Sequence, residues 1–317
     1  QTQTLNFAIK KPAYIYDPSE IAVVSFIQDN TSKEVKQAAY SAPKPIQNDA
    51  KLVNITGIPV APDCNMNINP SVTFSNVSAT TITSAELRYK IDATGSMNIY
   101  NWTGSLAPGQ STTVVLNPTT TTGGSHRLFA YVKLPNGLAD PNRYNDTSYV
   151  NFAKFIAPVS GNVLEQFTAT TFPPAGWIKE DVESDNIGWS RKTGAGANAT
   201  TACAKMDFYN SAPGNTDNFY VKPLDLSGAI NPSLSFYKAY APYTAATPEN
   251  DYLGVDVSTD CGQTWVNLWG EAGTTLATAA ATTSSYSPTA AQWAQVIVDL
   301  SAYAGQSNVI VRFNALS

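Results

Sequence analysis

Short runs in which apolar and polar residues alternate make up much of the chain between residues 50 and 155. These runs are KLVNITGI (51–58), PSVTFSNVS (70–78), SAELRYKI (84–91), STTVVLNP (111–118), HRLFAYVKL (126–134) and TSYVNFAKF (147–155). Stretches rich in Pro, Gly, Asn and Asp separate them. Short alternating strands with regular turn signals are typical of a β-sandwich. We therefore predict an Ig-like β-sandwich over residues 48–157, in which residues 102–116 form a hairpin.

A second set of strand patterns follows from residue 163 to the end. Aromatic and β-branched residues recur in DNFYVKPLDL, PSLSFYKAY, DYLGVDV, WVNLW, WAQVIVDL and SNVIVRF, with Gly, Pro or Asp at their ends. This pattern predicts another β-sandwich over residues 160–317. Within it, residues 251–270 read as a hairpin whose turn carries Cys261, and we expect Gly262 to take the positive-φ position of that turn.

The N-terminal segment has a different pattern. Residues 5–16 and 20–29 read as two strands, and residues 29–40 predict a helix, because Asn30 or Thr31 is a suitable N-cap and Glu34 follows at capping-box spacing. A polar stretch with two prolines, residues 41–51, indicates a linker. The whole fold class is thus mainly β with a short α/β segment at the N-terminus.

Composition and charge exclude several classes of function. Only 14% of the 317 residues are charged and the net charge is −5, so there is no basic stripe for nucleic acid. No run of about 18 apolar residues is present to span a membrane. Three cysteines without CxxC spacing and one histidine leave little basis for zinc. His126, in a Gly-rich turn before a strand, reads as a solvated structural residue, and we expect no enzyme activity.

The N-terminal stretch VVSFIQDNTSKEVKQAAY resembles the closing part of thioredoxin-like domains in secreted outer-membrane proteins. The resemblance implies that residues 1–44 are the C-terminal remnant of such a domain. A redox CxxC in that family would lie upstream, so no thiol chemistry is assigned to these residues.

The stretches PSVTFSN, WTGSLAPGQSTTVVL and NGLADPNRYND resemble adhesion-type Ig-like repeats of bacterial surface proteins. In the last of them, Asp140, Asn142, Asn145 and Asp146 are close in sequence. Their oxygen atoms could hold calcium, a cation that prefers oxygen ligands. Turn chemistry explains the same residue types equally well, because Asn and Asp bond their own backbone and tolerate a left-handed conformation.

The sequence from LEQFTATTFPPAGWIKEDVESDNIGWSRKTG to the end resembles the MAM-like, cleaved-adhesin or choice-of-anchor jelly rolls of surface proteins exported by type IX secretion. In that family the stretch VSTDGGQTW is a strand, a tight turn and a return strand, so Cys261 stands where a turn glycine is expected. We predict a Cys203–Cys261 disulfide, which an exported protein would retain. With that pairing, Cys64 is unpaired or bonded outside this sequence. A buried free Cys261 is the alternative.

The jelly-roll resemblance also implies a calcium site near the first strand, the central hairpin and the last strand. The candidate ligands are Glu165, Asp207, Asp217 and Asp251. The family continues beyond residue 317 to a final strand with an acidic residue, so we expect part of the site outside this sequence. Hydrolysis by a carboxylate pair is the enzymatic interpretation of the same residues, and sequence does not separate the two.

Tryptophans offer a further kind of site, because an exposed ring can stack on the apolar face of a sugar. Most of the tryptophans after residue 160 lie in alternating contexts that favour the core. Trp189 and Trp269 are the two that we consider as ligand-stacking residues.

Together these features predict non-catalytic modules of an exported bacterial surface protein that act in adhesion or in recognition of a glycan or protein. The expected location is extracellular or on the outer-membrane surface, and the expected partners are a surface ligand or the export machinery. The alternative is that these are accessory modules of a larger secreted enzyme or thiol-redox protein whose active site lies outside residues 1–317.

Overall fold

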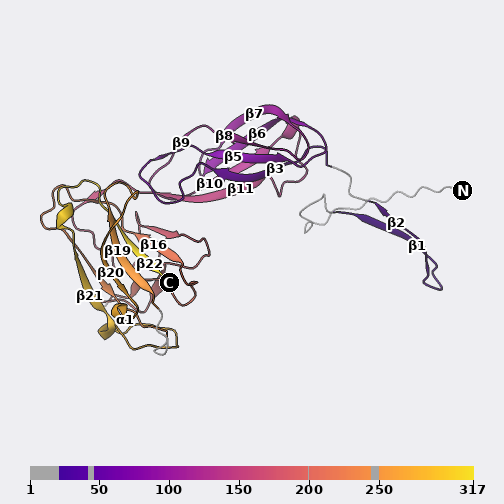
Figure 1. Ribbon diagram of the computed structural model, residues 1–317. Helices are drawn as coiled ribbons and strands as arrows, with labels where there is room; N and C mark the ends of the chain where they lie inside the picture. The colour runs from indigo at the N-terminus through magenta and orange to yellow at the C-terminus, as the bar shows by residue number, and fades with distance from the viewer. Residues whose placement is uncertain (1–20, 42–45, 199, 244–249) are drawn as a thin grey trace. The chain divides into compact units, whose positions relative to one another are not determined.

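The computed structural model describes residues 21–41, 46–198, 200–243 and 250–317, and these residues form mainly β-strands (Figure 1). The predicted mainly β fold is thereby confirmed. The predicted strand at residues 5–16 lies outside the described residues. The chain divides into two compact units, which we call unit 1 and unit 2. Unit 1 comprises Gln1–Ile58, Asn67–Thr119 and Arg127–Asn151, and unit 2 comprises Pro59–Met66, Thr120–His126 and Phe152–Ser317.

The predicted N-terminal helix is wrong, because residues 23–41 form an antiparallel hairpin. Its strands are β1 (Val23–Gln28) and β2 (Val35–Ser41). Asn30 and Thr31 begin no helix: Asp29 Oδ1 accepts the backbone N–H groups of Thr31 and Ser32 at 2.9 and 2.8 Å. An Asp that bonds the chain just after it favours a turn as readily as a helix start.

The turn is closed by backbone bonds between Asp29 and two later residues. The Lys33 N–H donates to the Asp29 carbonyl, and the Asp29 N–H donates to the Glu34 carbonyl, both at 2.9 Å. Lys33 has φ 60°, a left-handed conformation that interrupts a right-handed helix. Local turn chemistry, together with the β-branched Val35, therefore decided this segment in favour of strands.

Unit 1 contains most of the strands predicted between residues 50 and 155, arranged in two sheets. The first sheet has the order β11–β10–β6–β7, with bounds Thr147–Lys154, Gly124–Lys133, Ile82–Ile91 and Asn98–Leu106. The second has the order β3–β5–β8, with bounds Ala50–Thr56, Ser71–Asn76 and Ser111–Val115. Residues 102–116 are therefore no hairpin, because β7 and β8 belong to different sheets.

Alternating burial defines the core of unit 1. Val72 and Phe74 of β5 are fully buried while the residues between them are partly exposed, and Leu87 and Tyr89 of β6 follow the same rule. The Phe74 ring meets Trp102 of β7 edge to face at 5.1 Å, which joins the two sheets.

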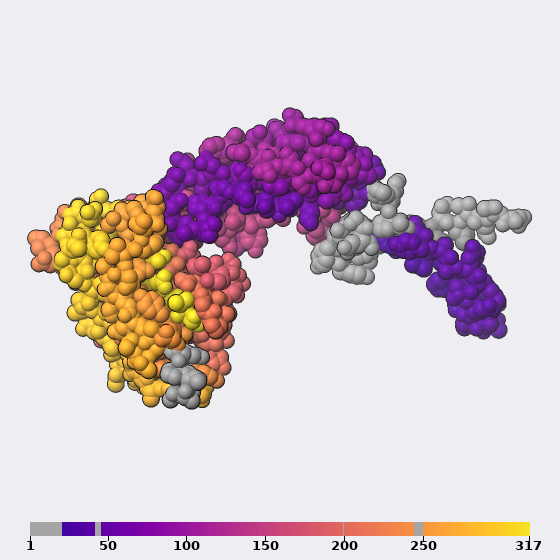
Figure 2. Space-filling view, viewed as in Figure 1, coloured from indigo at the N-terminus to yellow at the C-terminus, as the bar shows by residue number. Residues whose placement is uncertain are grey.

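Unit 2 is built on a sheet in the order β13–β16–β22–β19–β20. Its strands run over Ile178–Asp181, Thr216–Tyr220, Ile310–Leu316, Tyr252–Ser258 and Val266–Ala272. A separate antiparallel pair, β18 (Ser233–Lys238) and β21 (Ala294–Asp299), packs its apolar side chains into the same core. In Figure 2 the face of unit 2 turned to the viewer is formed largely by the C-terminal part of the chain, coloured orange to yellow.

Aromatic rings fill the core of unit 2. Phe219 of β16 is 1% exposed and stacks on Trp189 and Phe172 at centroid distances of 5.3 and 5.2 Å. Val255 of β19 and Val311 of β22 are fully buried beside them. Phe219, Val255 and Val311 come from neighbouring strands of the sheet, whereas Phe172 and Trp189 reach the same core from outside the strands.

Short elements complete the described residues. The remaining strands are β4 (Asn67–Ile68), β9 (Thr119–Thr120), β12 (Val159–Ser160), β14 (Ser190–Thr193), β15 (Ala202–Lys205) and β17 (Leu224–Asp225). The helical turns are η2 (Pro135–Gly137), α1 (Gly273–Leu276), η3 (Ala290–Gln292) and η4 (Ser301–Tyr303). In the part of the chain that the structure describes, no helix has the length and apolar character needed to cross a membrane.

Candidate functional site

The turn that carries Cys261 joins β19 to β20, so the predicted hairpin is confirmed. We call residues 259–265 the Cys261 turn. Gly262 has φ 82°, as predicted, and Cys261 itself has φ 61°. Two successive left-handed residues reverse the chain, and a glycine at either position carries no steric cost.

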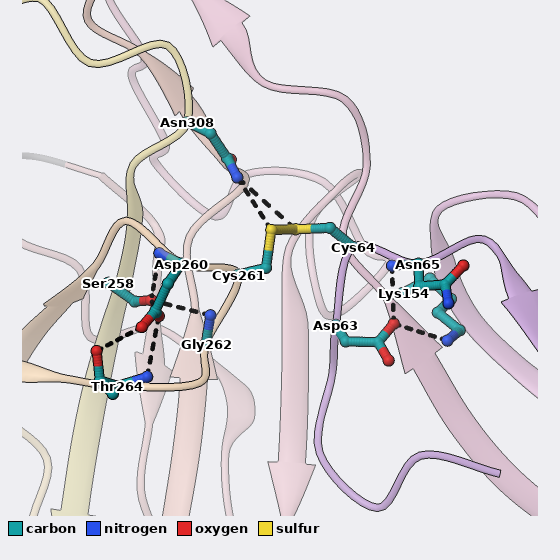
Figure 3. Close-up of a disulfide and its surroundings, with 10 residues drawn as sticks. All are labelled: Asp63, Cys64, Asn65, Lys154, Ser258, Asp260, Cys261, Gly262, Thr264 and Asn308. Carbon is teal, nitrogen blue, oxygen red and sulfur yellow. Dashed lines mark hydrogen bonds and ion pairs between the residues drawn. A yellow bond between two sulfur atoms is a disulfide. The ribbon is translucent and has the colours of Figure 1, made fainter. Parts of the chain in front are cut away.

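Asp260 organises the Cys261 turn through both of its carboxylate oxygens (Figure 3). Its Oδ1 accepts the Ser258 hydroxyl at 2.7 Å and the Thr264 N–H at 2.9 Å, and its Oδ2 accepts the Thr264 hydroxyl at 2.5 Å. The bonds from Thr264, followed by that from Ser258, lower the pKa of Asp260 to about 2. The turn is thus a closed hydrogen-bonded unit around an ionised carboxylate.

Cys261 forms a disulfide with Cys64, so the predicted Cys203–Cys261 pairing is wrong in its partner. The two Cα atoms lie 5.6 Å apart and the residues are 197 positions apart in sequence. The Asn308 amide donates toward Cys261 Sγ at 3.2 Å and toward Cys64 Sγ at 3.7 Å (Figure 3). Cys261 is therefore structural, and neither sulfur is a free nucleophile.

The pairing follows from the path of the chain between β3 and β4. Residues 59–66 interrupt the strands of unit 1 but belong to the compact unit 2. Sequence reasoning placed Cys64 in the Ig-like module and looked for a partner of Cys261 within its own module. The spacing of cysteines in the sequence does not indicate that a segment of one module packs within another.

A buried ion pair forms a second attachment of the same segment. Lys154 Nζ lies 2.7 Å from Asp63 Oδ1, and the Lys154 side chain is fully buried while that of Asp63 is 36% exposed. The Phe155 N–H also donates to the Asp63 carbonyl at 2.8 Å. A buried ammonium needs a counter-charge, so the ion pair both fixes the position of Asp63 and stabilises the buried charge of Lys154.

Cys203 is a free, half-buried thiol on β15. It lies opposite Lys192 of β14, and burial raises the pKa of its thiol despite that lysine. A thiol with a raised pKa is a poor nucleophile, because the thiolate is the reactive form.

Of the predicted calcium ligands, Asp217 lies in the densest acidic surroundings. It is 2% exposed, and on the strand pair β13–β16 it stands directly opposite Asp181. Burial, and then the carboxylates of Asp181, Glu183 and Asp185, raise the pKa of Asp217 to about 7. Like charges placed opposite each other across strands are destabilising unless something compensates them.

Asp181 ends β13, and the loop after it carries Glu183 and Asp185. Asp181 accepts the backbone N–H groups of Asp185 and Asn186 at 3.1 and 2.7 Å, and Glu183 accepts that of Thr216 at 3.1 Å. A Cβ on Gly188 would lie 2.4 Å from Asp217 Oδ1, so this buried oxygen points at the loop. Asp217 Oδ1 has no hydrogen-bond partner. The sequence signal was present as acidic residues at alternate positions 181, 183 and 185, and our reasoning missed it.

The other predicted ligands are held by protein groups elsewhere in unit 2. Glu165 Oε1 accepts the Phe167 N–H at 2.6 Å, and Asp207 pairs with Lys205 at 3.3 Å. Asp251 is buried, and its Oδ2 accepts the Tyr240 hydroxyl at 2.6 Å. Burial raises the pKa of Asp251. Among the described residues, no three His, Cys, Asp or Glu side chains are arranged as a metal site by themselves.

The two tryptophans considered for ligand stacking belong to the core of unit 2. Trp189 is 8% exposed, so its ring is not available to a ligand, and Trp269 is half-buried against Phe236 at 5.3 Å. The exposed aromatic pair is instead Tyr209 and Tyr243, which are 70% and 36% exposed with ring centroids 5.4 Å apart. Tyrosines in a turn carry no periodic pattern, which is why sequence reasoning did not single out this pair.

His126 has a structural environment. A ring nitrogen lies 2.9 Å from the Thr122 carbonyl oxygen, and the ring packs on Phe152 at 5.4 Å. These contacts fix the start of β10.

Comparison with known proteins found no matching family model and no matching curated protein. Solved structures similar to this chain include the CARDB domain of a Pyrococcus furiosus protein in complex with di-metal ions, at 24% identity over 35% of this chain and 96% of that one, TM-score 0.29. A domain of a protein described as a cell-surface protein of Methanosarcina acetivorans matches at 23% identity over 35% of this chain and 94% of that one, TM-score 0.29. The secreted serine protease VesC of Vibrio cholerae matches at 12% identity over 85% of this chain and 44% of that one, TM-score 0.23. With TM-scores below 0.5, these likenesses carry no argument about function.

Proposed function

We propose that this chain forms non-catalytic β-sandwich modules of an exported bacterial surface protein and acts in adhesion, by recognising a glycan or protein ligand. The observation that carries the proposal is the Cys64–Cys261 disulfide. Structural disulfides persist in oxidising compartments such as the cell exterior and are rare in the cytosol. Export by the type IX route and kinship with the MAM-like jelly rolls remain part of this proposal.

The exposed tyrosine pair supports glycan recognition in particular. Tyr209 and Tyr243 present adjacent aromatic rings on unit 2, and aromatic rings stack on the apolar faces of sugars while the phenol hydroxyls remain in water. We assign to this pair the stacking role that sequence reasoning gave to Trp189 and Trp269.

Calcium is the cofactor of the proposal, with Asp217 as its candidate carboxylate ligand. Since no three His, Cys, Asp or Glu side chains of the described residues form a metal site by themselves, its other ligands would be backbone or amide oxygens near the loop after β13. A cation there would offset the repulsion between Asp181 and Asp217 and would give the unpartnered Asp217 Oδ1 a ligand. Oxygen-only donors of this kind suit a hard cation.

The test is binding of the purified full chain to an array of polysaccharides in calcium-containing buffer. We expect saturable binding that weakens about fivefold in Tyr209→Ala and Tyr243→Ala, since an aromatic contact contributes roughly 1 kcal/mol. Tyr40→Ala is the matched control, because Tyr40 is 68% exposed on the β1–β2 hairpin. Lack of saturable binding to any glycan would contradict glycan recognition, and release of shortened products would contradict a non-catalytic role.

A further inference from the structure

Unit 1 contains a second group of acidic and amide side chains, in the loop between η2 and β11. We call residues 140–146 the Asp140 loop. Asp140, Asn142 and Asp146 are 5%, 2% and 0% exposed, and Asp49, on the chain just before β3, is 2% exposed beside them. Acidic residues are almost never fully buried without a partner.

Hydrogen bonds fix how these side chains lie. Asp140 Oδ2 accepts the Ala50 N–H at 2.8 Å and its Oδ1 accepts the Asn142 N–H at 2.9 Å. The Asn145 amide donates to Asp49 Oδ1 at 2.9 Å. These bonds use the Asn142 backbone N–H and the Asn145 amide as donors, and they draw Asp49, Asp140, Asn142 and Asn145 into one cluster.

Three oxygen atoms of the Asp140 loop are buried without a hydrogen-bond partner. They are Asn142 Oδ1, Asn145 Oδ1 and Asp146 Oδ1. An unsatisfied buried oxygen costs the full desolvation of that group, about 1–3 kcal/mol, and three within five consecutive residues require an explanation. All three are acceptors, so the missing partner is a donor or a cation.

The charges of the cluster indicate which of these it is. Lys133 Nζ lies 3.1 Å from Asp146 Oδ2, which leaves Oδ1 of the same carboxylate open, and the exposed Arg143 is a second cation near Asp146. The carboxyl groups of Asp49, Asp140 and Asp146 outnumber these two cations in a buried place, so a cation is a better partner for the open oxygens than a further neutral donor.

We propose that the Asp140 loop binds one calcium ion through the side-chain oxygens of Asp140, Asn142, Asn145 and Asp146. Carboxylates mixed with amide oxygens in a flexible arrangement suit calcium, whereas magnesium demands near-ideal octahedral geometry. Asparagine oxygens are essential to this ligand set, because no three His, Cys, Asp or Glu side chains of the described residues form a metal site by themselves. The site is separate from the proposed calcium site at Asp217, which lies in unit 2.

The decisive variant is Asn142→Leu in the full chain. If the loop binds calcium, the variant melts below the wild type only when calcium is present, whereas a purely structural loop predicts the same difference with and without calcium. Without calcium, removing the orphaned Oδ1 leaves the melting temperature of unit 1 unchanged or higher. With calcium at about 100 times its Kd, the wild type gains roughly 5–10 °C and Asn142→Leu loses that gain. Asn142→Asp adds a ligand charge, so it melts lower without calcium and keeps the gain with calcium.

Two controls complete the design. Asn101→Leu changes an exposed asparagine on β7 and keeps the full calcium gain. Asp217→Asn keeps the gain in unit 1, so failure of the proposed site in unit 2 is distinguished from failure here. By isothermal titration, Asn142→Leu binds one calcium ion fewer than the wild type. A calcium gain in Asn142→Leu equal to that of the wild type, no gain in the wild type, or an equal gain with magnesium would each overturn the proposal.

Discussion

The Cys261 turn and the Asp140 loop both place Asp side chains at the end of a strand. The carboxylate of Asp260 in the first is fully hydrogen-bonded, whereas that of Asp146 in the second is not. In the Cys261 turn, both oxygens of Asp260 accept donors from Ser258 and Thr264, and the pKa of Asp260 falls to about 2. In the Asp140 loop, Asp146 Oδ1 has no donor, and burial raises the pKa of that carboxyl. The same side-chain chemistry gives a completed turn in one case and an open set of acceptors in the other.

Two things differ between the Cys261 turn and the Asp140 loop: the hydrogen-bond donors near the carboxylate and its access to water. Asp260 remains in contact with water and has a threonine four residues later that donates both its N–H and its hydroxyl. The Asp140 loop has asparagines instead, and the side-chain amide of Asn145 donates to Asp49 rather than to Asp146. A loop whose hydrogen-bond acceptors are all paired needs no ligand. A buried loop with unpaired acceptors is a candidate binding site.

The largest expected effect comes from removing the crosslink at the Cys261 turn. Cys64→Ser with Cys261→Gly should lower the free energy of unfolding by about 2–5 kcal/mol, because the disulfide restricts the unfolded chain over 197 residues. Glycine at position 261 accepts φ 61° without strain. Denaturant unfolding measures the loss, and the calcium gain of the Asp140 loop should survive it.

Cys203→Ala is the control for this prediction, since Cys203 forms no disulfide. Peptide mapping of the non-reduced wild type should give a linked pair containing Cys64 and Cys261. Equal stability of the double variant and the wild type, or a linked pair containing Cys203, would contradict the structure.

The next effect concerns the Asp63–Lys154 ion pair, which attaches residues 59–66. We expect its two partners to differ in how much stability is lost when each is replaced. Asp63→Asn leaves the Lys154 ammonium buried without its counter-charge and should cost about 3 kcal/mol or more. Lys154→Met removes the buried charge and leaves a partly exposed carboxylate, so it should cost clearly less. Unfolding curves of the two variants at pH 7 give the ordering.

The exposed pair Lys36–Glu34 provides the matched control. Its side chains are 52% and 64% exposed, and Glu34→Gln should change the unfolding free energy by about 0–1 kcal/mol. If Lys154→Met proved as costly as Asp63→Asn, the buried ammonium would not be what Asp63 stabilises.

The smallest expected effect is the contribution of Asp260 to stability in acid. Its folded pKa lies below the unfolded value of 3.8, so its contribution is fully present above pH 3.8 and is lost as the pH falls toward 2. Asp260→Asn should therefore lower stability at neutral pH and flatten the acid limb between pH 5 and pH 2. Melting temperatures across that range test the prediction, and an acid limb of unchanged slope would count against it.

Several features of the fold could be predicted from local sequence patterns. Alternation located the strands of unit 1, such as β5 and β6, and the hairpin of β19 and β20 with Gly262 at positive φ. These features follow from the two-residue period of a half-buried strand and from the steric freedom of glycine, both of which are properties of the local chain.

The N-terminal segment shows where local patterns conflict. Asn30 or Thr31 with Glu34 satisfies the rules for a helix start, yet Asp29 just before them closes the turn of the β1–β2 hairpin. The same residue types suit either conformation, and the bonds of Asp29 with the left-handed Lys33 decided in favour of the hairpin.

What the sequence determined by itself is the class of this protein: strands, turns, low charge and cysteines without metal-ligand spacing. Only the tertiary structure decided which distant residues meet, such as the two cysteines of the disulfide and the facing carboxylates. Cys261 bonds to Cys64 because residues 59–66 join unit 2, and Asp217 meets Asp181 because β13 and β16 pair. Contacts between distant residues depend on chain path and strand register, and neither composition nor periodicity carries that information.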